Sequence, residues 1–199
     1  SNDAIQTSPR VKRNNNGDVF IQWKDLRFDP VNGDIFMQKI ASNGDALWTD
    51  GVQVDPTDGV NFSGRFASNN LGGFDIFWER GVYPNVDILF RRFGSSGSPL
   101  TNDPINVAIG DGYQFAPNII SGSGDSVFVV FADQSTGSID LRVQYFQGNN
   151  PIMQENGILA QKGLDGDIKY NNAFFNQSQD ITLFWEDNRA SKKIYSNRL

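Results

Sequence analysis

Hydrophobic and polar positions alternate over short stretches of this chain, and turn residues separate the stretches. Runs rich in Val, Ile and Phe have the length of a β-strand and are bounded by Gly, Asn or Asp; the strongest cover residues 18–23, 74–78, 126–131 and 180–185. No longer window keeps apolar side chains at helical spacing without an interrupting Gly or Pro. The pattern therefore predicts an all-β protein built from many short strands.

The strongest strands recur at a nearly constant interval. The aromatic residue that ends each of them returns every 53 to 55 residues, at Trp23, Trp78, Phe131 and Trp185. A second anchor returns every 53 residues, at Asp34, Asp87, Asp140 and Lys193. Each unit holds four predicted strands in about 53 residues, which is typical of a β-propeller blade.

These repeats predict a four-bladed β-propeller that forms one domain over residues 1–199. The blades are expected at residues 10–55, 64–109, 117–161 and 170–199. The fourth unit ends after its third strand, and residues 4–7 resemble the fourth strand of the other units. We therefore expect residues 4–7 to complete the last blade and close the ring of a monomer. A piece of a larger propeller, or a dimer of two half-rings, remains an alternative.

Composition narrows the range of functions. The chain has 17 Lys and Arg against 23 Asp and Glu, and its net charge of −6 argues against a nucleic-acid partner. The absence of His and Cys excludes a Ser-His-Asp triad, a Cys nucleophile, disulfides and Cys-based metal sites. No apolar run is long enough to insert into a membrane, and residues 1–4 show no signal-peptide pattern.

A short charged motif follows the aromatic anchors. Its Asp and Arg, two residues apart at a strand end, are expected to tie the turn together by charge-assisted hydrogen bonds, although a repeated ion or sugar site is an alternative. The motif reads Trp-x-Asp-x-Arg in the first and fourth units and is partial in the others. The predicted structural residues are Trp23, Asp25, Arg27, Trp78, Phe131, Asp133, Trp185, Asp187 and Arg189.

The first unit continues with Asp34-Ile35-Phe36-Met37-Gln38, then Gly44, Trp48 and Gly51. This order resembles the W-x-D-x-R, D-I-[YF]-x-Q and G-x-x-x-W repeats of secreted and cell-surface bacterial β-propeller proteins. The third unit keeps Asp140 and Gln144 of the pattern, whereas the fourth has Lys193 at the position of the Asp. The resemblance implies an extracellular or cell-surface location and no established activity.

Candidate ligand sites are few. Tyr83 and Trp48 are predicted to stack on sugar rings because they lie at turns. Asp165 and Asp167 form a Gly-hinged acidic pair that suits Ca²⁺. Asn118 and Asn172 enter the innermost strands, where a structural Ca²⁺ or Na⁺ is expected in the central channel. No other cofactor is expected.

The residue inventory favours a non-catalytic binding or adhesion module with a protein or carbohydrate ligand, because the chain lacks His, Cys and an assembled catalytic motif. We therefore expect that the chain is not an enzyme. One alternative is a carboxylate-dependent enzyme that acts on glycans, or a fragment of one, which needs convergent Asp or Glu from different blades. A spacer between other domains is the third alternative.

Overall fold

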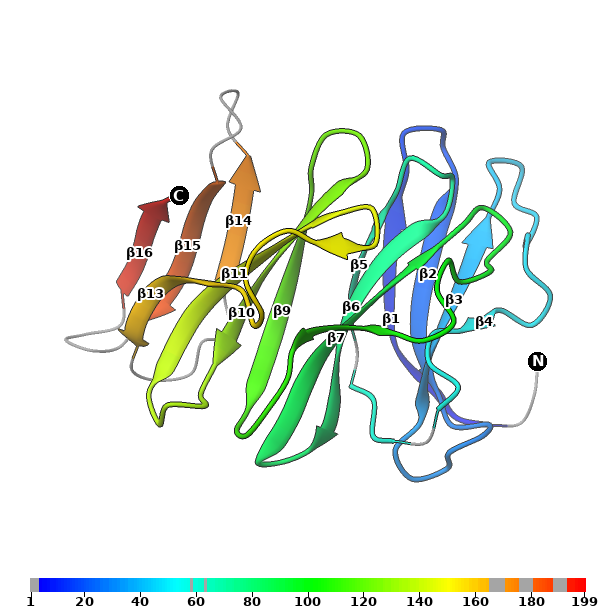
Figure 1. The fold of residues 1–199 in the computed structure, drawn as a ribbon. Helices are drawn as coiled ribbons and strands as arrows, with labels where there is room; N and C mark the ends of the chain where they lie inside the picture. The colour runs from blue at the N-terminus through cyan, green and yellow to red at the C-terminus, as the bar shows by residue number, and fades with distance from the viewer. Residues whose placement is uncertain (1–3, 58, 63, 165–170, 176–180, 188–192) are drawn as a thin grey trace.

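The chain folds into short antiparallel strands. The computed structural model describes residues 4–57, 59–62, 64–164, 171–175, 181–187 and 193–199. These residues form sixteen strands and no helix, which confirms the all-β prediction (Figure 1). The strands are β1 (Gln6–Arg13), β2 (Val19–Asp25), β3 (Asp34–Ile40), β4 (Val52–Gln53), β5 (Arg65–Ser68), β6 (Phe74–Val82), β7 (Asn85–Phe93), β8 (Ile105–Ala108), β9 (Gln114–Ser121), β10 (Ser126–Asp133), β11 (Ile139–Gln147), β12 (Asn150–Pro151), β13 (Ile158–Leu164), β14 (Asn171–Phe175), β15 (Ile181–Asp187) and β16 (Lys193–Arg198).

The strands form separate sheets that follow the sequence repeats in order. The first sheet contains β1 to β4, the second β5 to β8, the third β9 to β13 and the last β14 to β16. Consecutive strands pair antiparallel in each of them, except that β13 pairs with β11 and not with β12. Figure 1 shows the sheets side by side in a row, with the N-terminal sheet at one end and the C-terminal sheet at the other.

The predicted apolar runs lie in the second strand of each sheet. In the two middle sheets, both faces of that strand are covered by neighbouring sheets. In β6, Phe74 to Trp78 are all buried. Trp78 belongs to a core cluster with Phe20 of the first sheet, whereas Phe77 belongs to a cluster with Val129 of the third. Alternate side chains of β6 thus pack against the sheets on its two sides, which explains why its apolar run is continuous.

The prediction that residues 4–7 complete the last blade and close the ring is wrong. Residues 6–7 pair with β2 of the first sheet, Gln6 opposite Asp25 and Thr7 opposite Lys24, and Leu26 N–H donates to the Ile5 carbonyl. A register shift follows Thr7, where Ser8 has a φ of 54°, and this bulge keeps both halves of β1 on β2. The described part of the last sheet contains three strands, and the two ends of the chain lie at opposite ends of the row (Figure 1). The closed four-bladed ring is therefore not confirmed.

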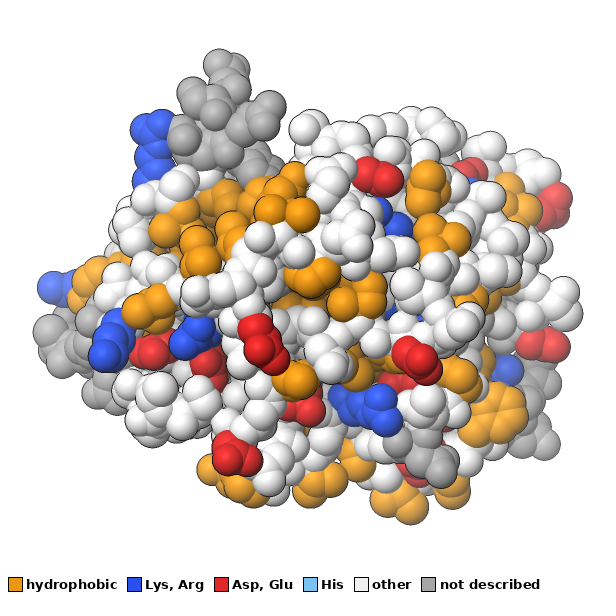
Figure 2. All heavy atoms as spheres, in the orientation of Figure 1, with side chains coloured by type: hydrophobic (Ala, Val, Ile, Leu, Met, Phe, Trp, Pro, Cys, Tyr) orange, Lys and Arg blue, Asp and Glu red, His pale blue; other side chains and the backbone are white. Residues whose placement is uncertain are grey.

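The surface is mixed in character. On the face drawn in Figure 2, acidic and basic side chains are interspersed with polar and apolar ones. Across the described residues, no helix is long and apolar enough to cross a membrane.

Candidate functional site

The first strands of the four sheets come together. β5 contacts both β1 and β9, and β9 in turn contacts β14. We call this line of strands, β1, β5, β9 and β14, the inner edge. Side chains that successive sheets place on the inner edge converge, which makes it the part of the fold where one site can draw on several sheets.

Four residues occupy one equivalent level of the inner edge. Each is paired with the residue that directly precedes the aromatic anchor of its own sheet, and the four are Arg10, Arg65, Asn118 and Asn172. The sequence predicts a cation near the two Asn residues. That cation stays a prediction, and two positively charged residues, Arg10 and Arg65, share the level of the two Asn residues. The repeat register carries this signal, since Arg10 and Arg65 lie 55 residues apart, but the first strands were too weak in pattern to reveal it.

Glu79 is a carboxyl group between the second and third sheets. It lies on β6, two residues beyond the partner of Arg65, and its Oε1 accepts a hydrogen bond from the Ala116 N–H of β9 at 2.8 Å. Burial raises the pKa of Glu79 above its ordinary value of 4.5, although the Ala116 hydrogen bond and the positive charge of Arg65 act in the opposite direction. The sequence does not single out Glu79, because it lies within a strand and only the packing of β9 against β6 buries its carboxyl group.

Lys12 adds a third cation to the inner edge. It follows Arg10 by two residues on β1, so the two side chains lie on the same face of the strand. Its Nζ lies 5.8 Å from the centre of the Phe66 ring on β5. Partial burial lowers the pKa of Lys12, and repulsion by Arg65 and then Arg10 lowers it further. The three cations are therefore close enough to interact.

A polar cavity of about 520 Å³ lies where the first strands turn into the second strands. Three such turns, one from each of the first three sheets, contribute to its wall. The lining is mostly Asn, Ser and Gly, with one Asp and one Arg: Asn14, Asn15, Asn16, Ser68, Asn69, Asn70, Gly72, Asp75, Arg92, Ser121, Gly122, Gly124 and Ser126. Such side chains offer hydrogen bonds and little apolar surface.

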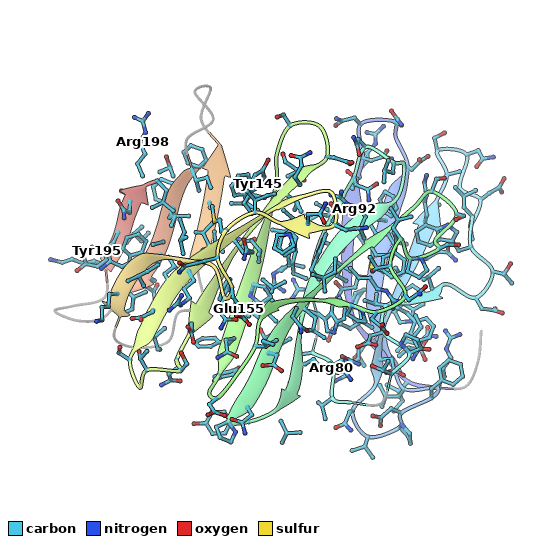
Figure 3. The ribbon with its side chains drawn as sticks, in the orientation of Figure 1. Arg80, Arg92, Tyr145, Glu155, Tyr195 and Arg198 are labelled. Carbon is cyan, nitrogen blue, oxygen red and sulfur yellow. The ribbon has the colours of Figure 1, made fainter. Side chains whose placement is uncertain are left out.

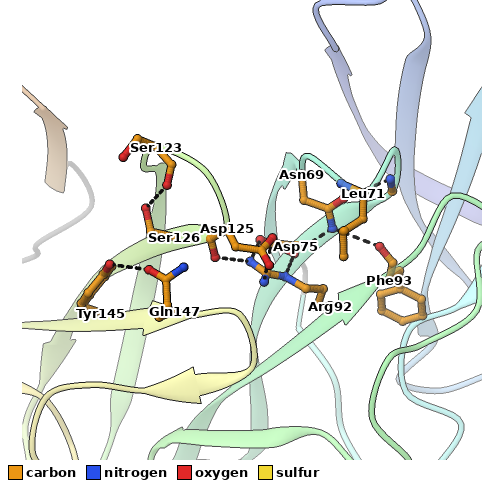
Figure 4. A network of polar contacts seen from close by, with 11 residues as sticks. Asn69, Leu71, Asp75, Arg92, Phe93, Ser123, Asp125, Ser126, Tyr145 and Gln147 are labelled. Carbon is orange, nitrogen blue, oxygen red and sulfur yellow. Dashed lines mark hydrogen bonds and ion pairs between the residues drawn. The ribbon is translucent and has the colours of Figure 1, made fainter.

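The Asp75 carboxylate in this cavity already accepts hydrogen bonds from the protein on both oxygens. Arg92 donates from Nε and Nη2 to the two carboxylate oxygens of Asp75, both at 2.7 Å, and Asn69 donates to the same carboxylate at 3.0 Å (Figure 4). Figure 3 places Arg92 and Arg80 at opposite ends of the second sheet. Glu79, the neighbour of Arg80 in the chain, thus lies toward the end away from the cavity.

Comparison with known proteins gives structural matches only. No protein-family model and no curated protein matches the sequence. Among solved structures, the chain is similar to the α-L-arabinanase of Penicillium chrysogenum with a TM-score of 0.65 and 13% identity, over 99% of this chain and 64% of that one. It is also similar to a thermostable family-43 glycoside hydrolase, with a TM-score of 0.58 and 11% identity over 98% of this chain and 71% of that one. An ulvan lyase matches with a TM-score of 0.58 and 10% identity, over 96% of this chain and 55% of that one.

The fold is β-propeller-like. At these identities the likeness concerns the fold alone, and we call the four sheets blades 1 to 4 in chain order. This chain spans about two thirds or less of the arabinanase and the lyase.

The comparisons correct one prediction. We expected a chain that is not an enzyme, because it lacks His, Cys and an obvious motif. The expectation is contradicted by its structural neighbours, which are glycoside hydrolases and a polysaccharide lyase. The absence of His and Cys does not exclude an enzyme, because a pair of carboxyl groups suffices to hydrolyse a glycosidic bond.

The repeated Asp lies at a hydrogen-bonded strand end in blade 1. Asp25 is fully buried and accepts hydrogen bonds from Trp23 Nε1 at 2.8 Å, Arg27 Nη2 at 2.6 Å and Gln6 Nε2 at 3.0 Å. Burial by itself raises the pKa of Asp25, but the hydrogen bonds from Arg27 and Trp23 outweigh it and lower the pKa to about 2. The site is full, so the motif offers no free oxygen for a ligand.

In blade 3 the equivalent Asp is also buried and hydrogen-bonded, but its arginine partner comes from another strand. Asp133 is buried and accepts from Ser135 N–H at 3.0 Å and Gln114 Nε2 at 3.3 Å, while Arg142 Nε lies 2.7 Å from its carboxylate. Arg142 comes from the third strand of the blade and takes the place of the missing motif arginine.

The aromatic anchors of the last three sheets lie in the core. Trp78 and Phe131 are fully buried, Trp185 is buried, and Trp78 Nε1 donates to Asn61 at 3.0 Å. The side chains of Asp187 and Asn172 and the residues Asp165, Asp167 and Arg189 lie outside the described part of the chain. Within the described part, no group of three or more Asp or Glu is placed to hold a metal ion.

The two predicted stacking aromatics lie in different surroundings. Trp48 is 5% exposed, packs against Phe20 and Phe74, and donates from Nε1 to the Ser95 carbonyl at 3.2 Å, so its ring faces are taken. Tyr83 is 73% exposed at the tip of the β6–β7 hairpin, in an edge-to-face contact with Tyr113. Only Tyr83 of the pair is therefore free to stack on a sugar.

Proposed function

We propose that this chain is a glycan-acting enzyme, or the part of one that carries the catalytic acid, and that it works at the inner edge. The observation that carries the proposal is Glu79, a carboxyl of raised pKa held between two blades beside Arg65. A carboxyl whose pKa is raised keeps its proton to higher pH, as a group that protonates the oxygen of a departing sugar must. The β-propeller fold, shared with glycoside hydrolases and a polysaccharide lyase, supports this assignment.

The hydrogen bond from Ala116 fixes the position of the carboxyl. A backbone N–H on one oxygen leaves the other as the site of the transferable proton, and it holds the group between two rigid strands. The polar cavity at the other end of the blades offers amide and hydroxyl groups to further sugar units. Because polymeric glycans are met outside the cell, the proposal retains the extracellular or cell-surface location expected from the repeats.

The test is an activity assay on a panel of soluble polysaccharides, measured as new reducing ends and as ultraviolet absorbance of unsaturated ends. Glu79→Gln keeps an oxygen that can accept from Ala116 and replaces the acidic OH by an amide NH2, which cannot act as the acid. We expect it to lower kcat by about 100-fold or more, with an unchanged melting temperature. Glu155→Gln is the matched control, because Glu155 is an exposed carboxylate in a loop. Equal activity of the two variants on a turned-over glycan contradicts the proposal.

A further inference from the structure

Three cations gather at the inner edge of blades 1 and 2, in a protein whose net charge is −6. Arg10 and Lys12 come from β1, and Arg65 comes from β5. Their mutual repulsion contributes to a lowered pKa for Lys12, and repulsion by Arg10 also lowers the pKa of Arg65 after the larger effect of burial. Bringing like charges together costs free energy, so such a cluster calls for an anion that offsets the cost.

Unused hydrogen-bonding groups lie at the same place. Gln22 is fully buried directly opposite Arg10 in the strand pairing, and among the described residues neither its amide nitrogen nor its amide oxygen has a partner. Arg10 Nε is also without a hydrogen-bond partner within the described structure. Buried polar groups in folded proteins are nearly always paired, so these atoms point to a ligand that supplies both donors and acceptors.

We infer that the glycan bound here is acidic, carrying uronate or sulfate groups that Arg10, Lys12 and Arg65 recognise. The inference rests on the proposed function and names the substrate class of the same site. Carboxylate and sulfate share the chemistry that matters: planar or tripodal oxygens that accept paired hydrogen bonds from a guanidinium. The hydroxyl groups of the sugar ring supply the donors and acceptors that Gln22 lacks. A neutral glycan offers no charge to balance the three cations.

The position of the cluster relative to Glu79 gives it a role in orientation. Arg65 connects the two, since it pairs with Phe77, two residues before Glu79 on β6, and it interacts electrostatically with Glu79, Lys12 and Arg10. An acidic group held by the cations therefore places a neighbouring glycosidic oxygen on the Glu79 side of the inner edge. The cations are positioning residues, and the acid chemistry belongs to Glu79.

The experiment is affinity electrophoresis of the whole chain in native gels that contain polygalacturonate, dextran sulfate or plain dextran. We expect both acidic polymers, or one of them, to retard the protein, and we expect plain dextran to leave it unaffected. Retardation by only one acidic polymer identifies the group, carboxylate or sulfate. Added salt weakens the retardation, because it screens the charges.

The variant Lys12→Gln tests the cluster with little risk to the fold, because Gln keeps a polar side chain at a position where part of Lys12 reaches solvent. Its apparent affinity for the acidic polymer should fall about five-fold, and Arg10→Gln with Arg65→Gln should abolish binding. Lys162→Gln removes the same charge from an exposed position elsewhere and serves as the control. Melting temperatures confirm that each variant is folded.

The outcomes separate this inference from the proposed function. Equal loss in Lys12→Gln and Lys162→Gln, equal retardation by plain dextran, or no retardation by either acidic polymer overturns the inference. Turnover of neutral glycans only overturns it while leaving the proposed function intact. If Glu79→Gln binds the acidic polymers as well as the wild type does, the inference is supported. If Glu79→Gln also keeps full activity, the proposed function fails and the inference on binding stands.

Discussion

Lys39 and Arg92 occupy the same position in successive blades, and each donates a hydrogen bond to the same carbonyl position of the next blade. Lys39 Nζ reaches Gly72 O at 2.9 Å, and Arg92 Nη2 reaches Asp125 O at 3.0 Å. Each cation also pairs with a carboxylate of its own blade, Lys39 with Asp18 at 3.0 Å and Arg92 with Asp75 at 2.7 Å. We call this arrangement, a cation bound to a carboxylate of its own blade and to a carbonyl of the next, a charged latch. It recurs in blades 1 and 2 beside the polar cavity.

The latch of blade 2 should dominate stability because both partners are buried. Arg92→Met leaves Asp75 as a buried unpaired charge, and we expect the free energy of unfolding to fall by about 3–5 kcal/mol in urea titrations. The double variant Asp75→Asn with Arg92→Met should recover part of that loss. Arg198→Met is the control, since Arg198 extends away from the sheets (Figure 3), and it should change stability by less than about 0.5 kcal/mol. An Arg92→Met loss no larger than that of the control contradicts the latch.

Asp25 should make the protein sensitive to acid. Its folded pKa of about 2 lies below the ordinary 3.8, so its stabilising effect is complete above about pH 4 and is lost as the pH falls toward 2. We expect the wild type to lose about 2 kcal/mol over that window through Asp25 alone. Asp25→Asn should be less stable at neutral pH and should lack this part of the acid loss. Parallel pH dependence of the two proteins, followed by chemical unfolding, counts against the assignment.

Glu79 should set the alkaline limb of the pH profile. A general acid must carry its proton, so kcat/KM falls as the pH rises through the pKa of Glu79, which burial raises above 4.5. Arg65→Gln removes a positive charge that lowers this pKa, and the limb should therefore move to higher pH, while KM rises for an acidic glycan. Lys162→Gln should leave the limb in place. A limb that stays fixed in Arg65→Gln shows that another group controls it.

Trp48 and Tyr83 should separate packing from binding. Trp48→Ala opens a void between blades 1 and 2 and should cost about 3–5 kcal/mol of unfolding free energy. Tyr83→Ala affects an exposed ring and should cost less than about 1 kcal/mol. If stacking at the hairpin tip assists glycan binding, Tyr83→Ala weakens retardation in the gel assay without changing the melting temperature. A Trp48→Ala variant of wild-type stability contradicts the core position of the ring.

Much of the repeat could be predicted from the sequence, because its recurring residues lie at fixed, short spacings within each unit. Gln38 and Gln144, two repeats apart in the resemblance pattern, make the same contacts. Each accepts a hydrogen bond from the next backbone N–H and holds the following loop, at the Trp48 backbone in blade 1 and at Met153 N–H and the Gln154 carbonyl in blade 3. Such contacts span about ten residues, so they recur wherever the sequence keeps the same spacing.

Closure of the ring could not be read in the same way. Residues 4–7 resemble an outer strand, yet they pair with β2, because Gln6 donates to Asp25 and the bulge at Ser8 keeps the chain on its own sheet. An extended segment with alternating side chains suits either sheet edge. The choice depends on which partner lies within reach, which is a property of the folded chain.

The sequence by itself determined the all-β class, the four repeating units and the strands that carry their aromatic anchors, because these follow from periodicity and turn chemistry. Only the tertiary structure decided which charges meet. Glu79 and Ala116 lie 37 residues apart, and Arg10 and Arg65 lie 55 apart, and both relations arise from the packing of one blade against the next. The burial that raises the pKa of Glu79, and the crowding of cations that calls for an acidic ligand, exist only after that packing, since electrostatic interactions depend on distance in space and on exclusion of water.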